Sequence, residues 1–261
     1  MIHSSAIIST KAKIHENVEI GPFCIVDDNV EIGNNTRLIA NVHISGNTII
    51  GNNNVFYPFS SIGLPPQDKK YQGETSKLII GNNNTIREHV TINPGTLDGG
   101  METCIKDNCL IMVGSHIAHD CIIKSNVILV NNATLGGHVT IDEFAIVGGN
   151  SGVHQFVSIG KYAMIGGMSG VESNIIPYGL YFGIRSNLRG MNLIGLKRKG
   201  LEKNKIQEIN SIFKKIFHKD GSLEKNIANL NKNEINIQEI NDILIFINAN
   251  LKRGIARYSN A

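Results

Sequence analysis

The stretch from Ile105 to Val171 decides the fold, and it reads IKDNCLIMVGSHIAHDCIIKSNVILVNNATLGGHVTIDEFAIVGGNSGVHQFVSIGKYAMIGGMSGV. An aliphatic residue recurs at every sixth position, at Ile105, Ile111, Ile117, Ile123, Leu129, Leu135, Ile141, Val147, Val153, Ile159, Ile165 and Val171. Neither a helix of period 3.6 nor a strand of period 2 keeps a six-residue register over such a length. The period predicts a parallel β-helix, in which about three hexapeptides complete a turn and residues roughly 18 apart stack.

A second inward position, four residues after each aliphatic one, is mostly small or β-branched, which lets the coil close tightly; these residues are Cys109, Ser115, Cys121, Val127, Ala133, Val139, Ala145, Ser151, Val157, Ala163 and Ser169. The same register already runs through Ile2, Ile8, Ile14, Ile20, Val26, Ile32, Leu38, Ile44, Ile50, Phe56 and Ile62. Gly-Asn and Asn-Asn pairs such as those in 33–35 and 51–54 suit the left-handed backbone needed at the corners. We therefore expect one coil over residues 1–177.

Two polar interruptions, at 63–78 and 96–103, must leave the coil as external loops. Loops on a rigid scaffold often carry functional groups. The first contains Asp68, Lys69 and Lys70, and the second contains Asp98 and Glu102. A plain solvated loop is the competing interpretation of each.

Residues 178–261 are expected to form a small helical domain that covers the end of the coil. After an irregular stretch at 179–189 and a basic segment at 192–200, apolar residues recur at helical spacing from Ile206 to Phe217. Ser222 is suited to cap a second helix, and the run from Ile237 to Ile247 marks a third.

Composition excludes little but points to an ordinary globular protein. The 261 residues are 41% hydrophobic, and the net charge of +3 gives no argument for a nucleic-acid partner. No run is long enough for a membrane span, and residues 1–10 lack the pattern of a signal peptide, so a cytoplasmic location is expected. The four cysteines lack metal-binding spacing and are read as small core residues.

Four histidines, His116, His119, His138 and His154, fall outside the inward register. The stacking rule places Asp120 one turn from His138, and His119 one turn from Gly137 and two turns from Gln155. Such a cluster could bind a metal through neutral imidazoles, or it could supply one imidazole base oriented by a carboxylate beside an oxyanion donor. Asp120 next to His119, and a glycine pair whose N–H groups can approach a substrate, favour the base.

The motifs QDKKY at 67–71, HIAHDC at 116–121, NNATLGGHV at 131–139, VHQF at 153–156 and GLKRKG at 195–200 together resemble the UDP-N-acetylglucosamine O-acyltransferases that open lipid A biosynthesis. The resemblance covers nearly the whole chain and implies a left-handed parallel β-helix with a helical C-terminal domain. It also implies transfer of an (R)-3-hydroxyacyl group from the phosphopantetheine of acyl carrier protein to the 3-hydroxyl of UDP-N-acetylglucosamine, by a homotrimer without a resident cofactor or metal.

Residue roles follow from the same resemblance. His119 would be the general base, Asp120 its orienting partner and Gly137 the oxyanion donor. The substrates would be held by Asp68, Lys70, His116, His138, His154, Gln155, Asn192, Arg198 and Lys199. Gly167 matches the position that limits the acyl pocket, and a glycine there implies room for a longer chain.

Two positions depart from the family pattern. Ile194 stands where many relatives have a glutamate, and Lys199 replaces the second arginine of GLKRRG, so the nucleotide contacts are expected to differ there. A related transfer to a 3-amino UDP-sugar remains open. So do a metal-dependent β-helix hydratase and a carrier-binding coil without turnover. An N-acyltransferase of the same pathway is disfavoured, because it usually carries a domain before its coil and here the register begins at Ile2.

Overall fold

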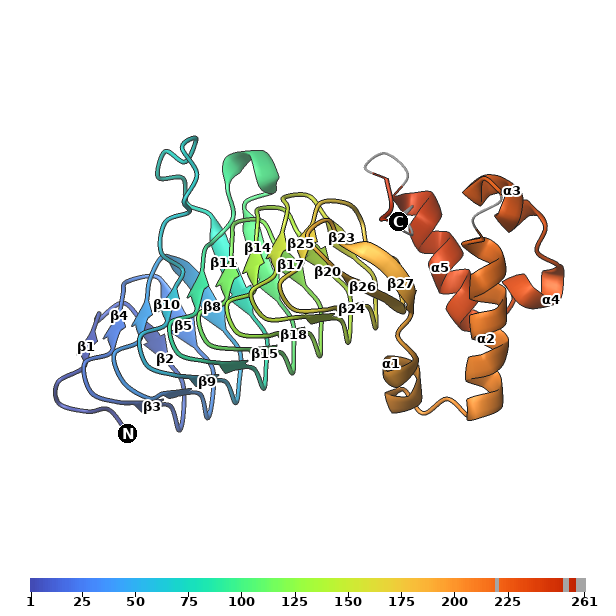
Figure 1. The fold of residues 1–261 in the computed structure, drawn as a ribbon. Coiled ribbons are helices and arrows are strands. Elements are labelled where there is room, and N and C mark those ends of the chain that lie inside the picture. The colour runs from blue at the N-terminus through green and yellow to red at the C-terminus, as the bar shows by residue number, and fades with distance from the viewer. Residues whose placement is uncertain (219–220, 251–253, 257–261) are drawn as a thin grey trace.

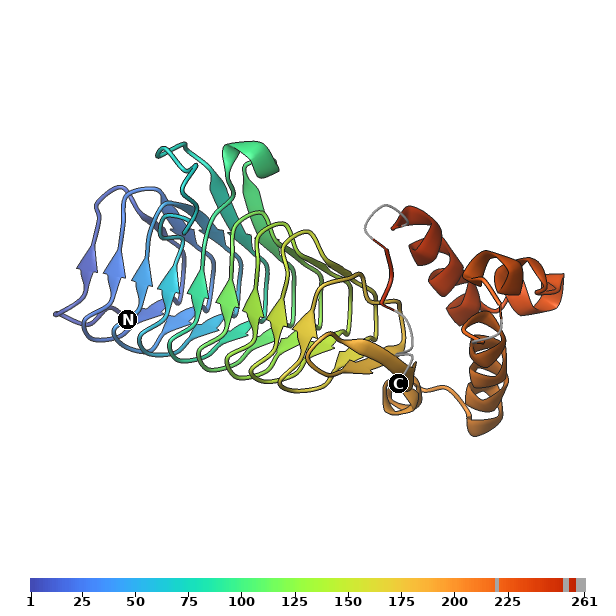
Figure 2. The ribbon, with the colours of Figure 1, turned by 45° about the horizontal axis from the view of Figure 1, so that its top comes forward.

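The computed structural model describes residues 1–218, 221–250 and 254–256, and it contains a three-sided coil followed by a helical domain (Figures 1 and 2). Three sheets form the sides of the coil. The nine-stranded sheet contains β1 (Ile7–Ile8), β4 (Ile25–Val26), β7 (His43–Ile44), β10 (Ser61–Ile62), β13 (Thr91–Ile92), β16 (His116–Ile117), β19 (Thr134–Leu135), β22 (Gly152–Val153) and β25 (Gly170–Val171).

The eight-stranded sheet contains β2 (Lys13–Ile14), β5 (Val30–Ile32), β8 (Asn47–Ile50), β11 (Lys77–Ile80), β14 (Glu102–Ile105), β17 (Ile122–Ile123), β20 (Thr140–Ile141) and β23 (Ser158–Ile159). The ten-stranded sheet contains β3 (Glu19–Ile20), β6 (Arg37–Leu38), β9 (Val55–Phe56), β12 (Thr85–Ile86), β15 (Leu110–Ile111), β18 (Ile128–Leu129), β21 (Ile146–Val147), β24 (Met164–Ile165), β26 (Gly179–Phe182) and β27 (Asn187–Met191). All pairs are parallel except β26 with β27.

The predicted register is confirmed strand by strand. Ile123 pairs with Ile141, and Ile141 pairs with Ile159, so residues 18 apart stack as expected. Every sixth aliphatic residue from Ile105 to Val171 is buried, and so is each small residue at the second inward position. The exceptions lie in the first turn, where Ile2 is 54% exposed and Ile8 and Ile14 are half-buried, because no earlier turn covers them.

The corners of the coil use left-handed backbone, as the asparagines predicted: Asn35, Asn53 and Asn83 all have positive φ. Bulky residues also occupy this conformation, and the sequence did not indicate that. Aromatic rings stack from turn to turn at these corners, with centroids 4.7 Å apart for Phe144 and Tyr162. Stacking contributes about 0.5–1.5 kcal/mol per pair, which offsets part of the cost of the left-handed backbone.

Two external loops leave the coil on the same side (Figure 2). The first loop covers 63–76, between β10 and β11, and the second loop covers 93–101, between β13 and β14, with the short 3₁₀ helix η1 (Leu97–Gly99). The first loop is slightly shorter than predicted, because the four-residue strand β11 begins at Lys77. The second loop begins and ends earlier than predicted, because β13 ends at Ile92 and β14 begins at Glu102. The coil resumes its register after each loop.

The C-terminal part differs from the sequence prediction at its beginning. Residues 179–189 were expected to be irregular and part of the helical domain. Instead 179–191 contain β26 and β27, and β26 adds to the ten-stranded sheet of the coil. The helices are α1 (Leu193–Arg198), α2 (Lys203–Ile216), α3 (Leu223–Ala228), α4 (Lys232–Ile235) and α5 (Gln238–Ala249). The short helices α1 and α4 were not predicted, whereas the cap of α3 by Ser222 is confirmed.

The helices pack on the end of the coil, and one hydrophobic cluster runs from the coil into α2 and α5. Polar contacts fix the junction. Asp242 of α5 forms an ion pair with Lys161 at 2.7 Å and accepts a hydrogen bond of 2.6 Å from the Tyr178 hydroxyl. Burial raises the pKa of Tyr178, and so does Asp242, so the phenol stays protonated and donates. Among the described residues, no helix is long and apolar enough to cross a bilayer.

We expect Asp242→Asn to destabilise the protein by about 1–3 kcal/mol at pH 7, because the charged partner of Lys161 is lost. Burial acts to raise the pKa of Asp242, but hydrogen bonds from Lys161, Tyr178 and Gln238 outweigh it, and the net pKa is lowered. The stabilisation is therefore present above the ordinary carboxyl pKa of about 4 and is lost as the pH falls through the lower folded-state value.

Urea denaturation of the native chain and the variant between pH 3 and pH 7 measures this difference. Asp28→Asn is the control, because Asp28 pairs with Lys11 on the exposed surface of the coil and its loss is expected to leave the midpoint nearly unchanged. A gap between the native chain and Asp242→Asn that stays constant down to pH 3 would contradict the assignment.

Candidate active site

His119 and Asp120 occupy the corner between β16 and β17. The Nδ1 atom of His119 lies 2.7 Å from Oδ2 of Asp120, whose side chain is completely buried. Because a carboxylate only accepts, Nδ1 carries the proton and Nε2 keeps its lone pair. The Nε2 atom lies 4.0 Å from Oδ2 of Asp68. The imidazole is therefore oriented as a base whose free nitrogen faces the first loop.

Stacking of successive turns brings His138 to this pair, as the sequence predicted. Its backbone N–H donates to the carbonyl of His119 at 3.0 Å, and the two rings meet edge to face with centroids 5.0 Å apart. Phe156, one turn further, stacks on His138 at 4.2 Å. Asp120, His138 and Phe156 all have left-handed backbone, with φ of 60°, 63° and 65°. The corner geometry itself therefore lines these side chains up along one edge of the coil.

Gly137 lies directly against the ring of His119. A Cβ atom added at Gly137 would lie 2.4 Å from Cε1 and 2.6 Å from Nε2 of His119, so only glycine allows this approach. The Gly137 N–H donates to no described backbone carbonyl. Equivalent corner residues, such as Gln155, share that property. What distinguishes Gly137 is its close contact with the His119 ring.

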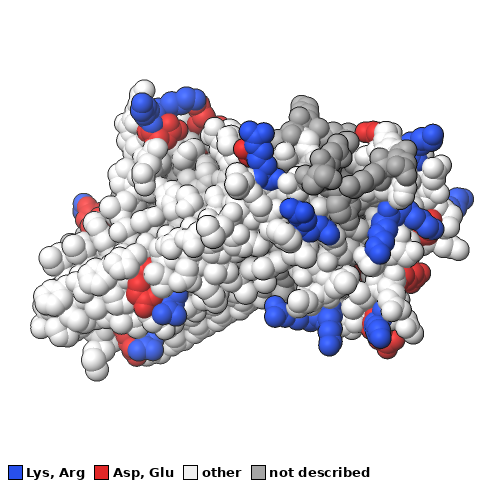
Figure 3. All heavy atoms as spheres, in the orientation of Figure 1, with Lys and Arg blue, Asp and Glu red and all other residues white. Residues whose placement is uncertain are grey.

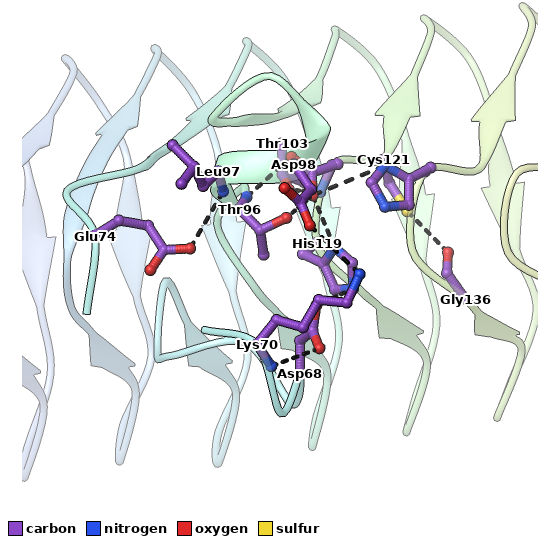
Figure 4. A network of polar contacts seen from close by, with 12 residues as sticks. Asp68, Lys70, Glu74, Thr96, Leu97, Asp98, Thr103, His119, Cys121 and Gly136 are labelled. Carbon is purple, nitrogen blue, oxygen red and sulfur yellow. Dashed lines mark hydrogen bonds and ion pairs between the residues drawn. The ribbon is translucent and has the colours of Figure 1, made fainter. Parts of the chain in front are cut away.

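The first loop carries Asp68 and Lys70 to the site (Figure 4). Asn93, at the base of the second loop, donates through Nδ2 to the carbonyls of Leu64 at 3.0 Å and Pro65 at 3.3 Å, which anchors the start of the first loop. Lys70 Nζ then lies 3.4 Å from Oδ2 of Asp98 in the second loop. The two loops therefore contact each other beside His119. Neither is a plain solvated loop, because each carries side chains that bind the other loop.

Sequence reasoning missed the residues that hold Asp120. Thr96 donates to its carboxylate through both the backbone N–H and the hydroxyl, and the hydroxyl of Thr103 accepts from the Asp120 backbone N–H at 2.7 Å. Their signal in the sequence was weak, because a threonine in a polar loop is ordinarily solvated. Only the return of the second loop onto the corner reveals their role.

Burial adjusts the remaining titratable groups of the site. It lowers the pKa of His116, with a smaller contribution from the charge of His119, and the ring bonds Thr91 Oγ1 through Nδ1 at 2.7 Å. It also lowers the pKa of His138, although Asp120 opposes this. Burial raises the pKa of Cys121 to about 12 and that of Cys109 to about 11, so neither is a thiolate nucleophile at neutral pH. The two cysteines are therefore excluded as nucleophiles, and burial favours the neutral forms of His116 and His138.

His119, Asp120 and His138 could also hold a metal ion, since one donor atom from each lies within 4.8 Å of the others. The carboxylate already accepts three hydrogen bonds, however. Its Oδ1 accepts from the Thr96 N–H, and its Oδ2 accepts from the Thr96 hydroxyl and from His119 Nδ1. A metal ligated through Oδ2 would compete with two of these donors, so the hydrogen bonding fits an orienting carboxylate better than a ligand.

Two cavities extend the site. A groove of about 480 Å³ runs along the nine-stranded sheet beside the His119 corner and is lined by Gly137, His154 and Gln155, among others. A pocket of about 340 Å³ lies on the ten-stranded sheet and is lined by Phe144, Tyr162, Asn192, Ile194 and Arg198, among others. The structure thus places the predicted residues in two groups on different sides of the coil.

Comparison with known proteins identifies the family. The model described as "Udp N-acetylglucosamine O-acyltransferase; Domain 2" matches residues 174–256, and the bacterial transferase hexapeptide model matches 11–38 and 105–137. A protein of Thermodesulfovibrio yellowstonii named acyl-[acyl-carrier-protein]--UDP-N-acetylglucosamine O-acyltransferase is 49% identical over 98% of this chain and 99% of its own length. The chain belongs to the UDP-N-acetylglucosamine O-acyltransferase family.

Solved structures agree with this assignment. The LpxA structure from Acinetobacter baumannii superposes with a TM-score of 0.91 at 41% identity, covering 98% of this chain and 99% of that one. The UDP-N-acetylglucosamine acyltransferase of Francisella novicida gives a TM-score of 0.94 at 38% identity, covering 100% of this chain and 95% of that one. The predicted left-handed parallel β-helix with a small helical end is confirmed.

Three positions that the resemblance to UDP-N-acetylglucosamine O-acyltransferases singled out lie away from His119. Lys199 Nζ pairs with the buried Glu239 of α5 at 2.5 Å, so in this chain it joins α1 to α5. Ile194 is 67% exposed at the pocket on the ten-stranded sheet. Gly167 stacks on Gly149 in the neighbouring turn, where an added Cβ would meet a carbonyl oxygen at 3.2 Å.

Because of the tight contact between Gly137 and His119, we expect Gly137→Ala to displace the imidazole, to cost about 1–3 kcal/mol of stability and to abolish most turnover. The same substitution in a chain that lacks the His119 ring provides a matched control. In a His119→Ala background the same methyl group meets an empty space, so Gly137→Ala is then expected to leave the melting temperature unchanged. Equal destabilisation in both backgrounds, measured by thermal denaturation, would show that His119 is not what restricts position 137.

Proposed function

We propose that this chain transfers an (R)-3-hydroxyacyl group from acyl carrier protein to the 3-hydroxyl of UDP-N-acetylglucosamine, the first step of lipid A biosynthesis. The observation that carries the proposal is the His119–Asp120 pair, whose imidazole lies directly against Gly137. The family relatives are named for this acyl donor and this acceptor.

The chemistry follows from that geometry. Nε2 of His119 takes the proton of the sugar hydroxyl as its oxygen attacks the thioester carbonyl, and Asp120 stabilises the imidazolium that forms. The tetrahedral oxyanion accepts a hydrogen bond from the Gly137 N–H. When the intermediate collapses, the C–S bond breaks, the imidazolium protonates the departing thiolate, and an ester and a free thiol remain. A thioester is already activated, so we propose neither a metal nor a resident cofactor.

The predicted substrate contacts divide between the two cavities. Asp68 lies 4.0 Å from the free nitrogen of His119, His138 packs edge to face on its ring, and Lys70 comes to the site on the same loop as Asp68 (Figure 4). His116 lies near enough to His119 for its pKa to be affected, and the groove of His154 and Gln155 also contains Gly137. We assign the sugar to this region. The pocket of Asn192 and Arg198 combines aromatic walls with a guanidinium group, which suits a nucleotide and its diphosphate. Lys199 would add a second cation there, in competition with Glu239.

A single chain cannot bring these two regions together, which supports a homotrimer. His119 lies on the edge between the nine-stranded and eight-stranded sheets, whereas the Arg198 pocket lies on the ten-stranded sheet, the opposite side of the prism. Neighbouring copies would place one chain's pocket beside the next chain's His119. Large apolar side chains at the corners are exposed and available for such contacts: Phe23 is 64% exposed, Phe59 56% and Met168 78%.

We assign acyl carrier protein to the helical end. Figure 3 shows Lys and Arg side chains distributed over that end, while the visible face of the coil carries few charges. An acidic carrier would be steered there by charge, with an affinity that falls as salt rises. Acyl carrier protein and a UDP-sugar as substrates support the proposal of a cytoplasmic location.

The first test is an assay of purified protein with a panel of (R)-3-hydroxyacyl carrier proteins and UDP-N-acetylglucosamine, with product masses recorded. We expect a gain of one hydroxyacyl group that does not depend on added chelator. A product formed only from a 3-amino UDP-sugar would replace the ester by an amide. Activity that disappears with a chelator and returns with zinc would overturn base catalysis in favour of a metal-dependent mechanism. A carrier-binding coil would give no product with either sugar.

His119→Ala is expected to lower kcat by a factor of about 100 to 10,000, the usual contribution of a general base. The melting temperature should stay close to that of the native chain, since the ring lies outside the coil core. His3→Ala, far along the coil at its exposed N-terminal end, is the matched control and should leave kcat unchanged. Retention of more than about a tenth of the rate by His119→Ala would reject His119 as the base.

A further inference from the structure

The second loop covers the carboxylate of Asp120. Thr96 reaches this carboxylate twice: its N–H donates to Oδ1 at 3.0 Å, and its hydroxyl donates to Oδ2 at 2.6 Å. Oδ2 is the same oxygen that accepts from His119 at 2.7 Å. Thr96 itself is only 4% exposed. The Asp120 carboxylate thus accepts hydrogen bonds both from His119 and from Thr96 of the second loop.

The backbone of the second loop seals the carboxylate from solvent. A Cβ atom added at Gly99 would lie 2.0 Å from the Asp120 carboxylate carbon, so the 3₁₀ turn passes directly over it and requires glycine there. The side chain of Asp120 is completely buried as a result. A carboxylate cut off from water stays charged only where other donors replace its hydration. The Asp120 carboxylate accepts three hydrogen bonds, and Thr96 donates two of them, one from its backbone N–H and one from its hydroxyl.

We propose that Thr96 is a positioning residue of the reaction, which fixes the Asp120 carboxylate so that Oδ2 meets the Nδ1 proton of His119. Thr96 acts through Asp120 and does not touch the reacting atoms. The inference rests on the proposed function, because it assigns Thr96 a part in the base catalysis by His119.

The hydroxyl can be tested separately from the loop. The second loop is anchored by other hydrogen bonds: Gly95 N–H donates to the Lys77 carbonyl at 3.2 Å, Met101 N–H donates to the Thr96 carbonyl at 3.0 Å, and Leu97 N–H donates to the Glu74 carboxylate at 3.2 Å. None of these involves the Thr96 side chain. Thr96→Val keeps the shape and the backbone contacts and removes the hydroxyl alone.

The experiment compares Thr96→Val and Thr96→Ser with Thr36→Val in the carrier-protein assay. Thr36 is also fully buried and its hydroxyl donates to the Gly51 carbonyl at 3.0 Å, but it lies in the coil away from the site, so it controls for the loss of a buried hydroxyl. We expect Thr96→Val to lower kcat by about 10-fold or more, as for a hydrogen bond to a charged group, with the KM for UDP-N-acetylglucosamine changed less than about twofold. Thr96→Ser should restore most of kcat, and Thr36→Val should retain it.

A double-mutant cycle then asks whether Thr96 acts through Asp120. In an Asp120→Asn background, Thr96→Val is expected to cost less than about twofold, because the charged acceptor is already gone. The same fold loss in both backgrounds, a loss confined to KM, or full kcat in Thr96→Val would each overturn the inference. A native chain that forms no product with any acyl carrier would instead refute the proposed function, and this role of Thr96 with it.

Discussion

The constraint on which the rest of this structure depends is the closure of a coil every 18 residues, with one aliphatic side chain per side pointing inward. Parallel pairing fixes each residue above the one a full turn earlier, as Ile123 lies against Ile141. A slip of one residue would turn the buried aliphatic residues outward and expose the backbone of every later turn. The corners then have little freedom, and the chain must turn through a residue with left-handed backbone even at Asp120 and His138. That requirement costs stability locally but aligns side chains along an edge.

The active site is built on such an edge and completed by what the coil cannot supply. A rigid corner can hold His119 above Gly137, yet the buried Asp120 carboxylate, which accepts from His119 Nδ1, needs further donors. The second loop provides them through Thr96, and the first loop brings Asp68 opposite Nε2. Asn93 at the base of one loop anchors the other, so the two loops behave as one cover. The division suits catalysis, because the reacting groups stand on a scaffold and the loops adjust their surroundings.

The C-terminal helices do more than close the coil. Lys199 and Lys161 each pair with a carboxylate of α5, Glu239 and Asp242, and these contacts hold the pocket of Arg198 against the ten-stranded sheet. That pocket and His119 lie on opposite sides of one prism. In the proposed trimer, neighbouring coils would bring the two regions together.

The sequence by itself determined the coil, its register and the position of the His119–Asp120 pair relative to Gly137 and His138, because a strict period converts sequence distance into spatial distance. It also determined which helices cap the end, since Ile206 to Phe217 and Ile237 to Ile247 keep helical spacing. It could not reveal that 179–191 pairs with the coil, because those strands lack the six-residue period. Nor could it reveal Thr96 over Asp120 or Glu239 against Lys199. Those contacts join segments whose separation follows no repeat, so only the tertiary structure, through the path of the loops and the docking of α5, decided them.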